Sequence, residues 1–328
     1  MPTKAVIKSI GHALPSRRVT NHDLSKIVDT NDEWIVQRTG IKERRFCAEG
    51  EGTGTLAVDA AKEALDKSGL SRDEIDMVIV GTVSGDYLWP STATYVQNEL
   101  GLRNAGAFDV SAACAGFIYS LATANGFIES GMMKNIIVVG VDCLSKQVNW
   151  EDRTTCILFG DGAGAVVLTG VENTNRGIVK TVMFSDGSGA SSIHIELGGT
   201  KYPPGSQPNE NCIYGISMRG QEVYKFAVHA MGDACEKVLA EAGISPEEVD
   251  LFVPHQANLR IIDSAAKRFN FPPEKVFVNV HKYGNTSGGS IPLALYEAVE
   301  EGRLKPGMLV LTVGFGAGLV WGANLIRW

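Results

Sequence analysis

Short apolar runs alternate along this 328-residue chain with segments whose apolar residues recur every three to four positions. The first pattern is typical of buried strands and the second of amphipathic helices. Apolar runs predict strands at 5–10, 74–82, 106–110 and 135–140, and periodic segments predict helices at 55–68, 91–100, 117–129 and 219–242. This alternation predicts an α/β protein built from strand–helix units.

Cys114 lies where the predicted strand 106–110 gives way to the predicted helix 117–129. The partial positive charge at a helix N-terminus favours a thiolate. The placement therefore predicts a Cys114 pKa lowered from about 8.5 towards 7 or below. Its neighbours in the segment 111–116 are small and leave room for a substrate. Taken alone, Cys114 fits a buried packing residue better than a nucleophile, since free cysteines are among the most buried residues.

His255 and Asn285 occupy the same kind of position as Cys114. His255 follows an apolar run at 251–253, Asn285 follows another at 276–280, and each precedes a predicted helix. In an open α/β sheet, ligands bind beyond the carboxyl ends of the strands. A nucleophilic thiol, an imidazole and a carboxamide can therefore converge at three such ends.

Two glycine-rich stretches invite different interpretations. The turn at 314–318, GFGAG, offers backbone N–H groups suited to an oxyanion hole, although it also suits a turn without chemistry. The motif GDGAG at 160–164 leads directly into a strand. A dinucleotide-binding fingerprint needs its glycines to open a helix, so this motif predicts close backbone packing.

The two halves of the chain resemble each other. The segment 71–81 parallels 245–255, and the helices ending at Gly131 and Gly302 each lead into an apolar strand. These glycines are 171 positions apart (302 − 131 = 171), and the same offset leads from Cys114 to Asn285. A duplicated βαβ fold with pseudo-two-fold symmetry brings two such helix N-termini together at its centre.

This repeat predicts two halves, 1–172 with the cysteine and 173–328 with the histidine and asparagine. The connection between them, at 169–215, is rich in glycine and proline. We expect it to be irregular and to contain one hairpin.

Composition narrows the class of protein. The chain is 44% hydrophobic and 20% charged with a net charge of −7, so no overall basic field favours nucleic acid. No signal-peptide core is visible, and no apolar run approaches the length of a membrane span. The six cysteines are scattered, which indicates free thiols in a reducing cytoplasm without a disulfide framework or a zinc site.

The chain closely resembles β-ketoacyl-[acyl-carrier-protein] synthase III, of the thiolase-like superfamily, through the motifs DTNDEWIVQRTGIKER, DVSAACAGF, FGDGAGAVVL, PHQAN and NTSGGSIPLAL. The match runs from Val6 to Trp328. The resemblance implies duplicated βαβ halves in a five-layered αβαβα arrangement. It also implies decarboxylative condensation of an acyl-CoA primer with malonyl-[acyl carrier protein], which initiates fatty acid synthesis.

By this resemblance, Cys114, His255 and Asn285 form a Cys-His-Asn triad. Cys114 takes the acyl group, and the other two hydrogen-bond the malonyl thioester while CO2 leaves. The resulting enolate attacks the acyl-cysteine. The backbone amides of Cys114 and Ala317 hold the oxyanion during acyl transfer. Neutral donors suit a developing enolate, and the loss of CO2 removes the need for a strong base.

The resemblance also implies contacts for both substrates. Trp34 and Arg153 would sandwich the CoA adenine. Further contacts to CoA would come from Thr30, Arg38, Gly220, Ala257 and Asn258. The acidic carrier protein would dock on Gln256, Arg260, Lys267 and Arg268. Without the resemblance, Trp34 is a helix-packing residue, Arg153 is a surface charge, and the three basic residues form a solvated face.

The family also implies a homodimer, in which Trp89 would reach the partner's acyl pocket and favour short primers. By this resemblance, we expect acyl-CoA, malonyl-[acyl carrier protein] and acyl carrier protein as partners, with no cofactor or metal and no nucleic acid or membrane. One alternative is a starter-unit condensing enzyme or acyltransferase of a polyketide or other secondary pathway. A papain-type hydrolase is disfavoured because its cysteine lies in a different local motif. A non-catalytic scaffold is disfavoured because no triad member is missing.

Overall fold

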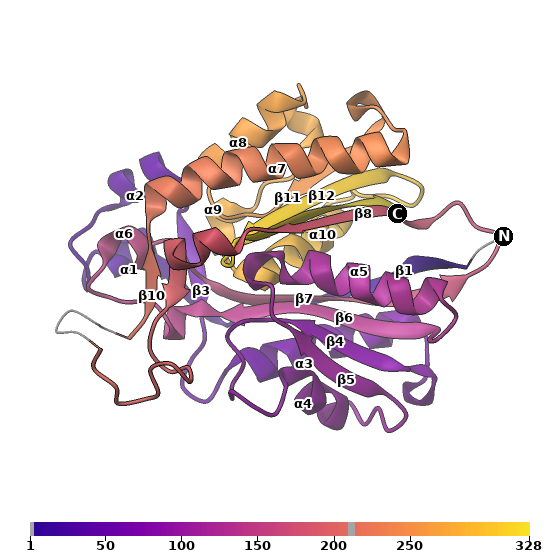
Figure 1. Ribbon diagram of the computed structural model, residues 1–328, viewed down its shortest axis with the longest axis horizontal. Helices are drawn as coiled ribbons and strands as arrows, with labels where there is room; N and C mark the ends of the chain where they lie inside the picture. Colours follow the sequence, from indigo (N-terminus) through magenta and orange to yellow (C-terminus); the bar gives the residue numbers. More distant parts are fainter. Residues whose placement is uncertain (1–2, 209–213) are drawn as a thin grey trace.

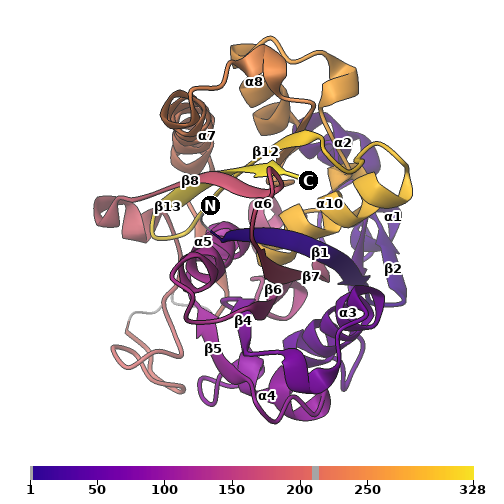
Figure 2. The same ribbon diagram turned by 90° about the vertical axis from the view of Figure 1, so that its right-hand side faces the viewer.

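The computed structural model describes residues 3–208 and 214–328. Two main sheets alternate with three layers of helices, in the order helix, sheet, helix, sheet, helix (Figure 2). This is the predicted αβαβα arrangement. The five layers explain the near-continuous apolar runs, because both faces of each main sheet are covered by helices.

The first sheet uses strands from the first half of the chain. In spatial order, they are β1 (Lys4–Ala13), β7 (Asp161–Val171), β6 (Asn135–Cys143), β4 (Met77–Gly81) and β5 (Gly106–Val110). β4 runs parallel to β5 and β6, whereas β7 is antiparallel to both of its neighbours. One face of this sheet packs on α3 (Thr53–Ser68) and α4 (Thr92–Glu99).

The second sheet uses strands from the second half. In spatial order, they are β11 (Leu251–Pro254), β12 (Leu309–Gly316), β13 (Val320–Arg327) and β8 (Gly177–Ser185). Its outer face is covered by α7 (Gly220–Ala242), and α8 (Leu259–Arg268) packs beside α7. Between the two sheets lie α5 (Gly116–Glu129) and α10 (Ser290–Glu300), the helices that follow Cys114 and Asn285 (Figures 1 and 2).

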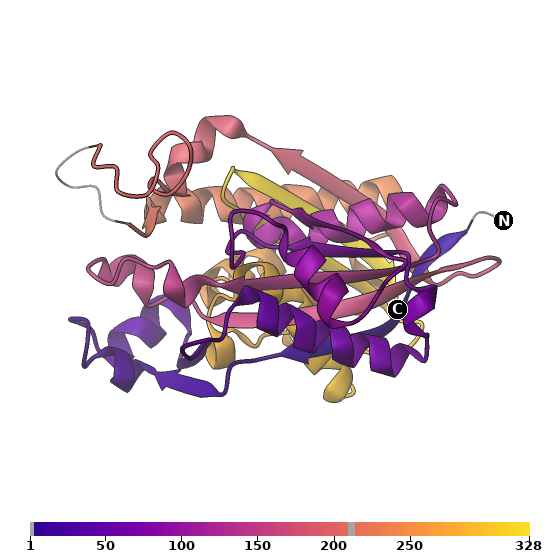
Figure 3. The same ribbon diagram turned by 90° about the horizontal axis from the view of Figure 1, so that it is seen from below.

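The remaining elements are short. They are β2 (Arg17–Thr20), α1 (Asn21–Leu24), α2 (Asp32–Thr39), β3 (Glu43–Phe46), α6 (Arg153–Cys156), β9 (Ile193–Ile195), β10 (Ile216–Met218) and α9 (Val280–Tyr283). Most of them gather at one end of the molecule (Figures 1 and 3). That end also holds the stretch around residues 190–208.

The prediction that residues 169–215 form an irregular connection is wrong in part. Residues Gly177–Ser185 form β8, which pairs with β13 along nearly its whole length. Further along, β9 and β10 form a short antiparallel pair. The motif GDGAG enters β7, where a Cβ on Gly162 or Gly164 would lie within 3 Å of α10. The prediction of close backbone packing is therefore confirmed.

The repeat is present with a different register from the predicted one. A 3-10 turn precedes each central helix, and the helices begin at Gly116 and Ser290, 174 positions apart (290 − 116 = 174). They end 171 positions apart (300 − 129 = 171), because α10 is three residues shorter than α5. The counterpart of Cys114 is therefore Gly288, and the predicted equivalence with Asn285 is wrong.

Candidate active site

One cavity of about 240 Å³ gathers the predicted triad. Its wall includes Cys114, His255 and Asn285, which follow three different strands or strand-like segments. It also includes residues that the resemblance assigned to CoA and to the oxyanion hole, namely Trp34, Arg38, Gly220, Ala257, Asn258 and Ala317. Its wall also includes residues of α2, α6 and β10. These elements gather at one end of the molecule (Figure 1).

Cys114 lies in the 3-10 turn Ala113–Ala115 that opens into α5, as the sequence predicted. Ala113 takes a left-handed backbone conformation with φ +45°, which is uncommon for a residue with a Cβ. Burial raises the pKa of the Cys114 thiol to about 12. The expected lowering of this pKa towards 7 is therefore wrong, because burial removes the hydration of the thiolate and the negative charge of Asp142 adds to this effect.

His255 directly follows β11 and is completely buried. Its backbone N–H donates to the Val313 carbonyl over 2.8 Å, and its ring packs edge-on against Phe315. Burial lowers the pKa of His255 to about 3, so the imidazole is neutral near pH 7. Neither ring nitrogen has a hydrogen-bond partner among the described residues. A neutral imidazole supplies one N–H donor, which is free to face a ligand.

Asn285 is fixed by its backbone and by one side of its carboxamide. Its N–H donates to the Leu158 carbonyl, and its own carbonyl accepts from Gly160 N–H. Its Oδ1 accepts the Ser287 N–H over 2.8 Å. The Nδ2 group is therefore the part of the carboxamide left to donate into the cavity.

The turn after β12 closes over Cys114. A Cβ built on Gly316 would lie 2.6 Å from the Cys114 backbone nitrogen, so only glycine allows this approach. The next residue, Ala317, lines the cavity beside Cys114. The predicted pair of backbone amides thus comes from two neighbouring segments.

A second cavity of about 210 Å³ lies on another side of Cys114. Its wall is mainly apolar and includes Val83, Leu144, Phe159, Ile195 and Ile216. Cys114 and Ala317 line both cavities. Trp89 lines neither of them; it is 85% exposed on its own chain.

At the other end of the first cavity, the side chains of two arginines approach the Trp34 indole. The Arg38 guanidinium carbon is 4.2 Å from the indole centroid, and that of Arg153 is 5.4 Å away. Arg153 also donates to the Asp29 carboxylate over 2.8 Å. An adenine between two planar groups needs about 7 Å, two van der Waals contacts of about 3.5 Å each. The predicted sandwich thus requires Arg153 to move outwards. Thr30 and Arg153 do not line the cavity.

The predicted carrier-protein contacts differ in exposure. Gln256 is buried, with its carboxamide bonded to the backbone of Pro254, Phe277, Asn279 and Val280. A docking role for Gln256 is therefore wrong, because its side chain holds the loop together from inside. Arg268 forms ion pairs with Asp233 and Glu236, so its charge is already compensated. Arg260 and Lys267 are exposed on α8.

Ser287 is a site residue that the sequence analysis missed. It follows Asn285 by two positions, is buried, and lines the second cavity with Cys114. The motif NTSGG contained the signal, since a serine so close to the triad asparagine enters the same turn.

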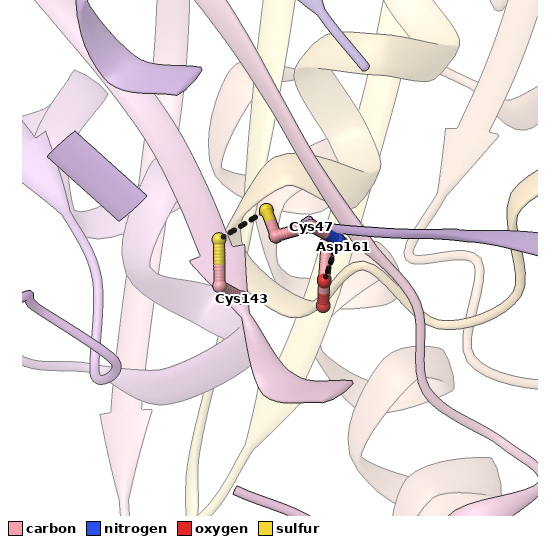
Figure 4. A group of neighbouring side chains, drawn as sticks. All are labelled: Cys47, Cys143 and Asp161. Atoms are coloured by element: carbon pink, nitrogen blue, oxygen red, sulfur yellow. Dashed lines mark hydrogen bonds between the residues drawn. The ribbon is translucent and has the colours of Figure 1, made fainter. Parts of the chain in front are cut away.

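A separate cluster joins Cys47, Cys143 and Asp161 (Figure 4). The two sulfurs are 3.2 Å apart, and the Asp161 carboxylate accepts from Cys47 N–H and from Ser145. Two thiolates on a tetrahedral zinc ion lie roughly 3.7 Å apart, given Zn–S bonds of about 2.3 Å. The cluster is thus a poor metal site, and none of its members lines the Cys114 cavities.

The cysteines were expected to be free thiols without a disulfide framework. Within the described chain, the free and buried thiols are Cys47, Cys114, Cys143, Cys156 and Cys235. Cys212 lies outside the described residues. Among the described helices, none combines the length and the apolar character that a membrane span requires.

Two strand–helix halves in five layers, with a cavity where the central helices begin, define the thiolase-like class of α/β enzymes. Models of 3-oxoacyl-[acyl-carrier-protein] synthase III and of its C-terminal part match residues 108–187 and 239–328. A β-ketoacyl-[acyl-carrier-protein] synthase III of Aquifex aeolicus is 49% identical over 328 residues, covering 100% of both chains. The chain therefore belongs to the β-ketoacyl-[acyl-carrier-protein] synthase III family, and it is an acyltransferase.

Other similar proteins agree with this membership. A β-ketoacyl-[acyl-carrier-protein] synthase III of Listeria monocytogenes is 50% identical over 324 residues, which are 99% of each chain. The crystal structure of the Aquifex aeolicus synthase has a TM-score of 0.91 and covers 99% of this chain and 100% of its own. A priming β-ketosynthase of a polyketide pathway is 34% identical, with a TM-score of 0.92 over 99% of this chain and 97% of its own.

Proposed function

We propose that Cys114, His255 and Asn285 carry out the condensation of an acyl-CoA primer with malonyl-[acyl carrier protein] that initiates fatty acid synthesis. The observation that carries this assignment is that all three side chains line one cavity together with Ala317. The proposal rests on the family to which the chain belongs and on the hydrogen-bonding state of each group.

In the first half-reaction, the Cys114 sulfur attacks the thioester carbonyl of acyl-CoA. A carbon–sulfur bond to Cys114 forms, the bond to the CoA sulfur breaks, and the thiol proton ends on CoA. The N–H groups of Cys114 and Ala317 face the oxygen on which negative charge develops. Such preorganised donors lower the barrier most when water is excluded, as it is around a buried cysteine.

In the second half-reaction, malonyl-[acyl carrier protein] loses CO2. The electron pair of the broken carbon–carbon bond forms an enolate at the thioester. His255 offers one N–H from a neutral ring, and Asn285 offers Nδ2 because its Oδ1 is engaged. The enolate carbon then attacks the acyl-Cys114 carbonyl, and the bond from that carbon to the Cys114 sulfur breaks. This yields the β-ketoacyl product and a Cys114 thiolate, which takes up a proton from water to regenerate the thiol.

Substrates enter from the Trp34 end of the cavity. Adenine inserts between Trp34 and Arg153 once the arginine moves outwards, and Thr30 and Arg38 lie near the nucleotide. Pantetheine passes Gly220, Ala257 and Asn258. The acidic carrier protein docks on the exposed basic residues of α8, Arg260 and Lys267, while Arg268 contributes less because its charge is paired. No cofactor takes part, since CoA enters as a substrate.

The working unit is a homodimer of chains whose halves are 1–172 and 173–328. Two features support this proposal. β5 lies at the edge of the first sheet, and an exposed edge strand pairs readily with another chain. Nearby, the apolar side chains of Tyr87, Leu88 and Trp89 are more than 70% exposed. Burial of this stretch against a second copy places Trp89 at the partner's acyl cavity.

The buried free thiols favour a reducing cytoplasm as the location of the protein.

A second candidate function is supply of a starter unit to a polyketide or another secondary pathway. The likeness to a priming β-ketosynthase of a polyketide pathway supports it. Both functions use the same acyl-cysteine, so the acceptor of the condensation step distinguishes them.

The test is intact-mass analysis after incubation with acetyl-CoA, isobutyryl-CoA or octanoyl-CoA, beside the Cys114→Ala variant. We expect an acyl adduct on the native chain and none on the variant. Malonyl-[acyl carrier protein] then discharges the adduct as a β-ketoacyl product. Discharge only to a different acceptor supports the secondary pathway. Failure of every primer to load the native chain contradicts the assignment of Cys114.

A further inference from the structure

Ser287 occupies an unusual place beside the nucleophile. It is the first residue of the 3-10 turn Ser287–Gly289, which meets the turn that carries Cys114 at the centre of the molecule. Its backbone is left-handed, with φ +50°, a conformation that is uncommon for a residue with a Cβ. Residues held in such strained conformations cluster at active sites, where the surrounding structure enforces them.

The Ser287 hydroxyl is buried without a conventional partner. The residue is 1% exposed, and Oγ has no hydrogen bond of good geometry among the described residues. Leaving a buried hydroxyl unpaired is unfavourable unless the group has another use. Ser287 and Cys114 line the same cavity wall, and the Ser287 hydroxyl acts to lower the pKa of the Cys114 thiol against the larger effect of burial.

We propose that Ser287 is a further catalytic residue, whose hydroxyl donates a hydrogen bond to the Cys114 sulfur as that sulfur becomes a thiolate. This inference rests on the proposed role of Cys114 as the nucleophile. The Ser287 backbone has a second role, because its N–H holds Oδ1 of Asn285. One residue thus serves both half-reactions, the first through its side chain and the second through its main chain.

Burial makes such a donor necessary. The titratable groups around Cys114 include Asp142, whose negative charge raises the thiol pKa further, and His255, which lines the same cavity and is neutral near pH 7. His194 lines the second cavity with Cys114. Neither Asp142 nor His255 supplies positive charge to a thiolate. Hydrogen bonds to charged groups are stronger than those between neutral groups, so a hydroxyl donor stabilises the thiolate more than the thiol.

The hydroxyl neither gains nor loses a proton in the step. The sulfur of Cys114 forms its bond to the acyl carbon, CoA leaves as a thiolate, and the proton released by Cys114 ends on CoA. The hydrogen bond from Ser287 is present while the Cys114 sulfur carries charge and weakens when the acyl-cysteine forms.

The chain contains a matched control. Ser120 in α5 is also completely buried, and its hydroxyl also lacks a partner among the described residues. It lines neither cavity next to Cys114. Ser120→Ala therefore removes an equivalent buried hydroxyl without touching the sulfur. Ser287→Gly complements Ser287→Ala, because both remove the hydroxyl but only the glycine relieves the left-handed backbone.

The experiment measures two rates on the full-length chain. The first is alkylation of Cys114 by iodoacetamide from pH 7 to 9, and the second is loading of acetyl-CoA followed by intact mass. We expect Ser287→Ala and Ser287→Gly to slow both by about tenfold, the factor that one unit of thiol pKa produces. Decarboxylation of malonyl-[acyl carrier protein] on pre-loaded enzyme, measured as CO2 release, should change less than about twofold, because the bond between Cys114 and its acyl group stays intact in that step. Ser120→Ala should match the native chain.

The outcomes separate this inference from the proposed function. If the native chain loads at Cys114 and the Ser287 variants load equally fast, the catalytic role of Ser287 is overturned and the role of Cys114 stands. If only Ser287→Ala is slow, backbone strain explains the effect and the inference also fails. If the native chain does not load at all, the proposed function itself is contradicted. Ser287→Cys checks proximity independently: mild oxidation should join it to Cys114 with a loss of 2 hydrogens, about 2 Da, and absence of that cross-link contradicts the placement.

Discussion

Gly288 donates its backbone N–H to the Asp142 carboxylate over 2.9 Å, at the place in the second half of the chain that corresponds to Cys114 in the first. The offset of 174 that relates the starts of the central helices also relates Asp142 to Gly316 (316 − 142 = 174). At the second-half turn, the Asp142 carboxylate therefore occupies the space in front of the Gly288 N–H. At the first-half turn, Gly316 has no side chain and leaves the space in front of the Cys114 N–H open. The fold thus binds an anion at one of two related N–H groups and keeps the other for substrate.

Replacement of Gly316 by alanine should close that space. The added Cβ would lie 2.6 Å from the Cys114 nitrogen and 2.9 Å from the Ala113 Cβ. We expect acyl loading to fall at least about 100-fold, the cost of losing one oxyanion donor. The measurement is the rate of adduct formation with acetyl-CoA.

Gly126→Ala is the control for this change. Gly126 lies inside α5, and a Cβ there has no neighbouring atom within 4 Å. We expect unchanged loading and slightly higher stability, since alanine favours a helix more than glycine does. Normal loading by Gly316→Ala would show that the open N–H of Cys114 is not part of an oxyanion hole.

The reactivity of Cys114 should rise steadily with pH. Its thiol pKa is raised to about 12 by burial, so the thiolate fraction increases about tenfold per pH unit throughout the range 7 to 9. The logarithm of the iodoacetamide rate should therefore be linear in pH with a slope near one. A plateau near pH 7 would mean that the helix N-terminus outweighs burial, as the position in the sequence had indicated.

Asn285→Ala should separate the two half-reactions. The variant loses the Nδ2 donor that faces the cavity but keeps Cys114 and the oxyanion turn. We expect acyl loading within a few-fold of native and decarboxylation of malonyl-[acyl carrier protein] slower by roughly 100-fold or more. Release of CO2 measures the second step. Equal losses in both steps would assign Asn285 a structural role instead.

Charge reversal on α8 should weaken carrier-protein binding selectively. Arg260→Glu and Lys267→Glu remove exposed positive charge, so KM for malonyl-[acyl carrier protein] should rise by roughly tenfold at low salt and by less at high salt. Loading of acetyl-CoA should not change. Arg268→Gln is the comparison, because this arginine is already paired with Asp233 and Glu236. An equal effect at Arg268 would contradict the ranking of the three residues.

Sequence alone predicted the local setting of the triad well. Cys114, His255 and Asn285 each end an apolar run, and an apolar run before a helix indicates a strand whose carboxyl end points at the site. The sequence could not predict β8, because its residues Val179 and Met183 are exposed and the segments on either side are glycine-rich. Such a strand at a sheet edge carries little periodic signal, and its pairing with β13 depends on long-range contacts.

Other errors have a common physical cause. The pKa of Cys114, the burial of Gln256 and the pairing of Arg268 all depend on neighbours that are distant in the chain. A helix N-terminus is visible in a sequence, whereas the desolvation that opposes it is not. The repeat was visible as well, but we aligned the two halves by the ends of the central helices. Because α10 is shorter than α5, this alignment matched Cys114 to Asn285 instead of Gly288.

Stability should depend on pH through His255. Its pKa is lowered from 6.5 to about 3 by burial, so between these values the unfolded chain binds a proton that the folded chain does not. Above pH 6.5, His255 therefore does not lower the free energy of unfolding. Below that value, the free energy of unfolding falls by about 1.4 kcal/mol for each pH unit down to pH 3. Between pH 7 and 5, the free energy of unfolding should therefore drop by about 2 kcal/mol on account of this group.

His255→Phe provides the matched variant, because phenylalanine keeps a buried ring against Phe315 and cannot be protonated. Urea unfolding of both proteins at pH 7 and 5 measures the difference. The native chain should lose about 2 kcal/mol more than the variant over this interval. Carboxylates contribute equally to both proteins, so they cancel in the comparison. Equal losses would show that His255 is protonated in the folded protein at pH 5, and a charged imidazole would then have to be considered as the donor to the enolate.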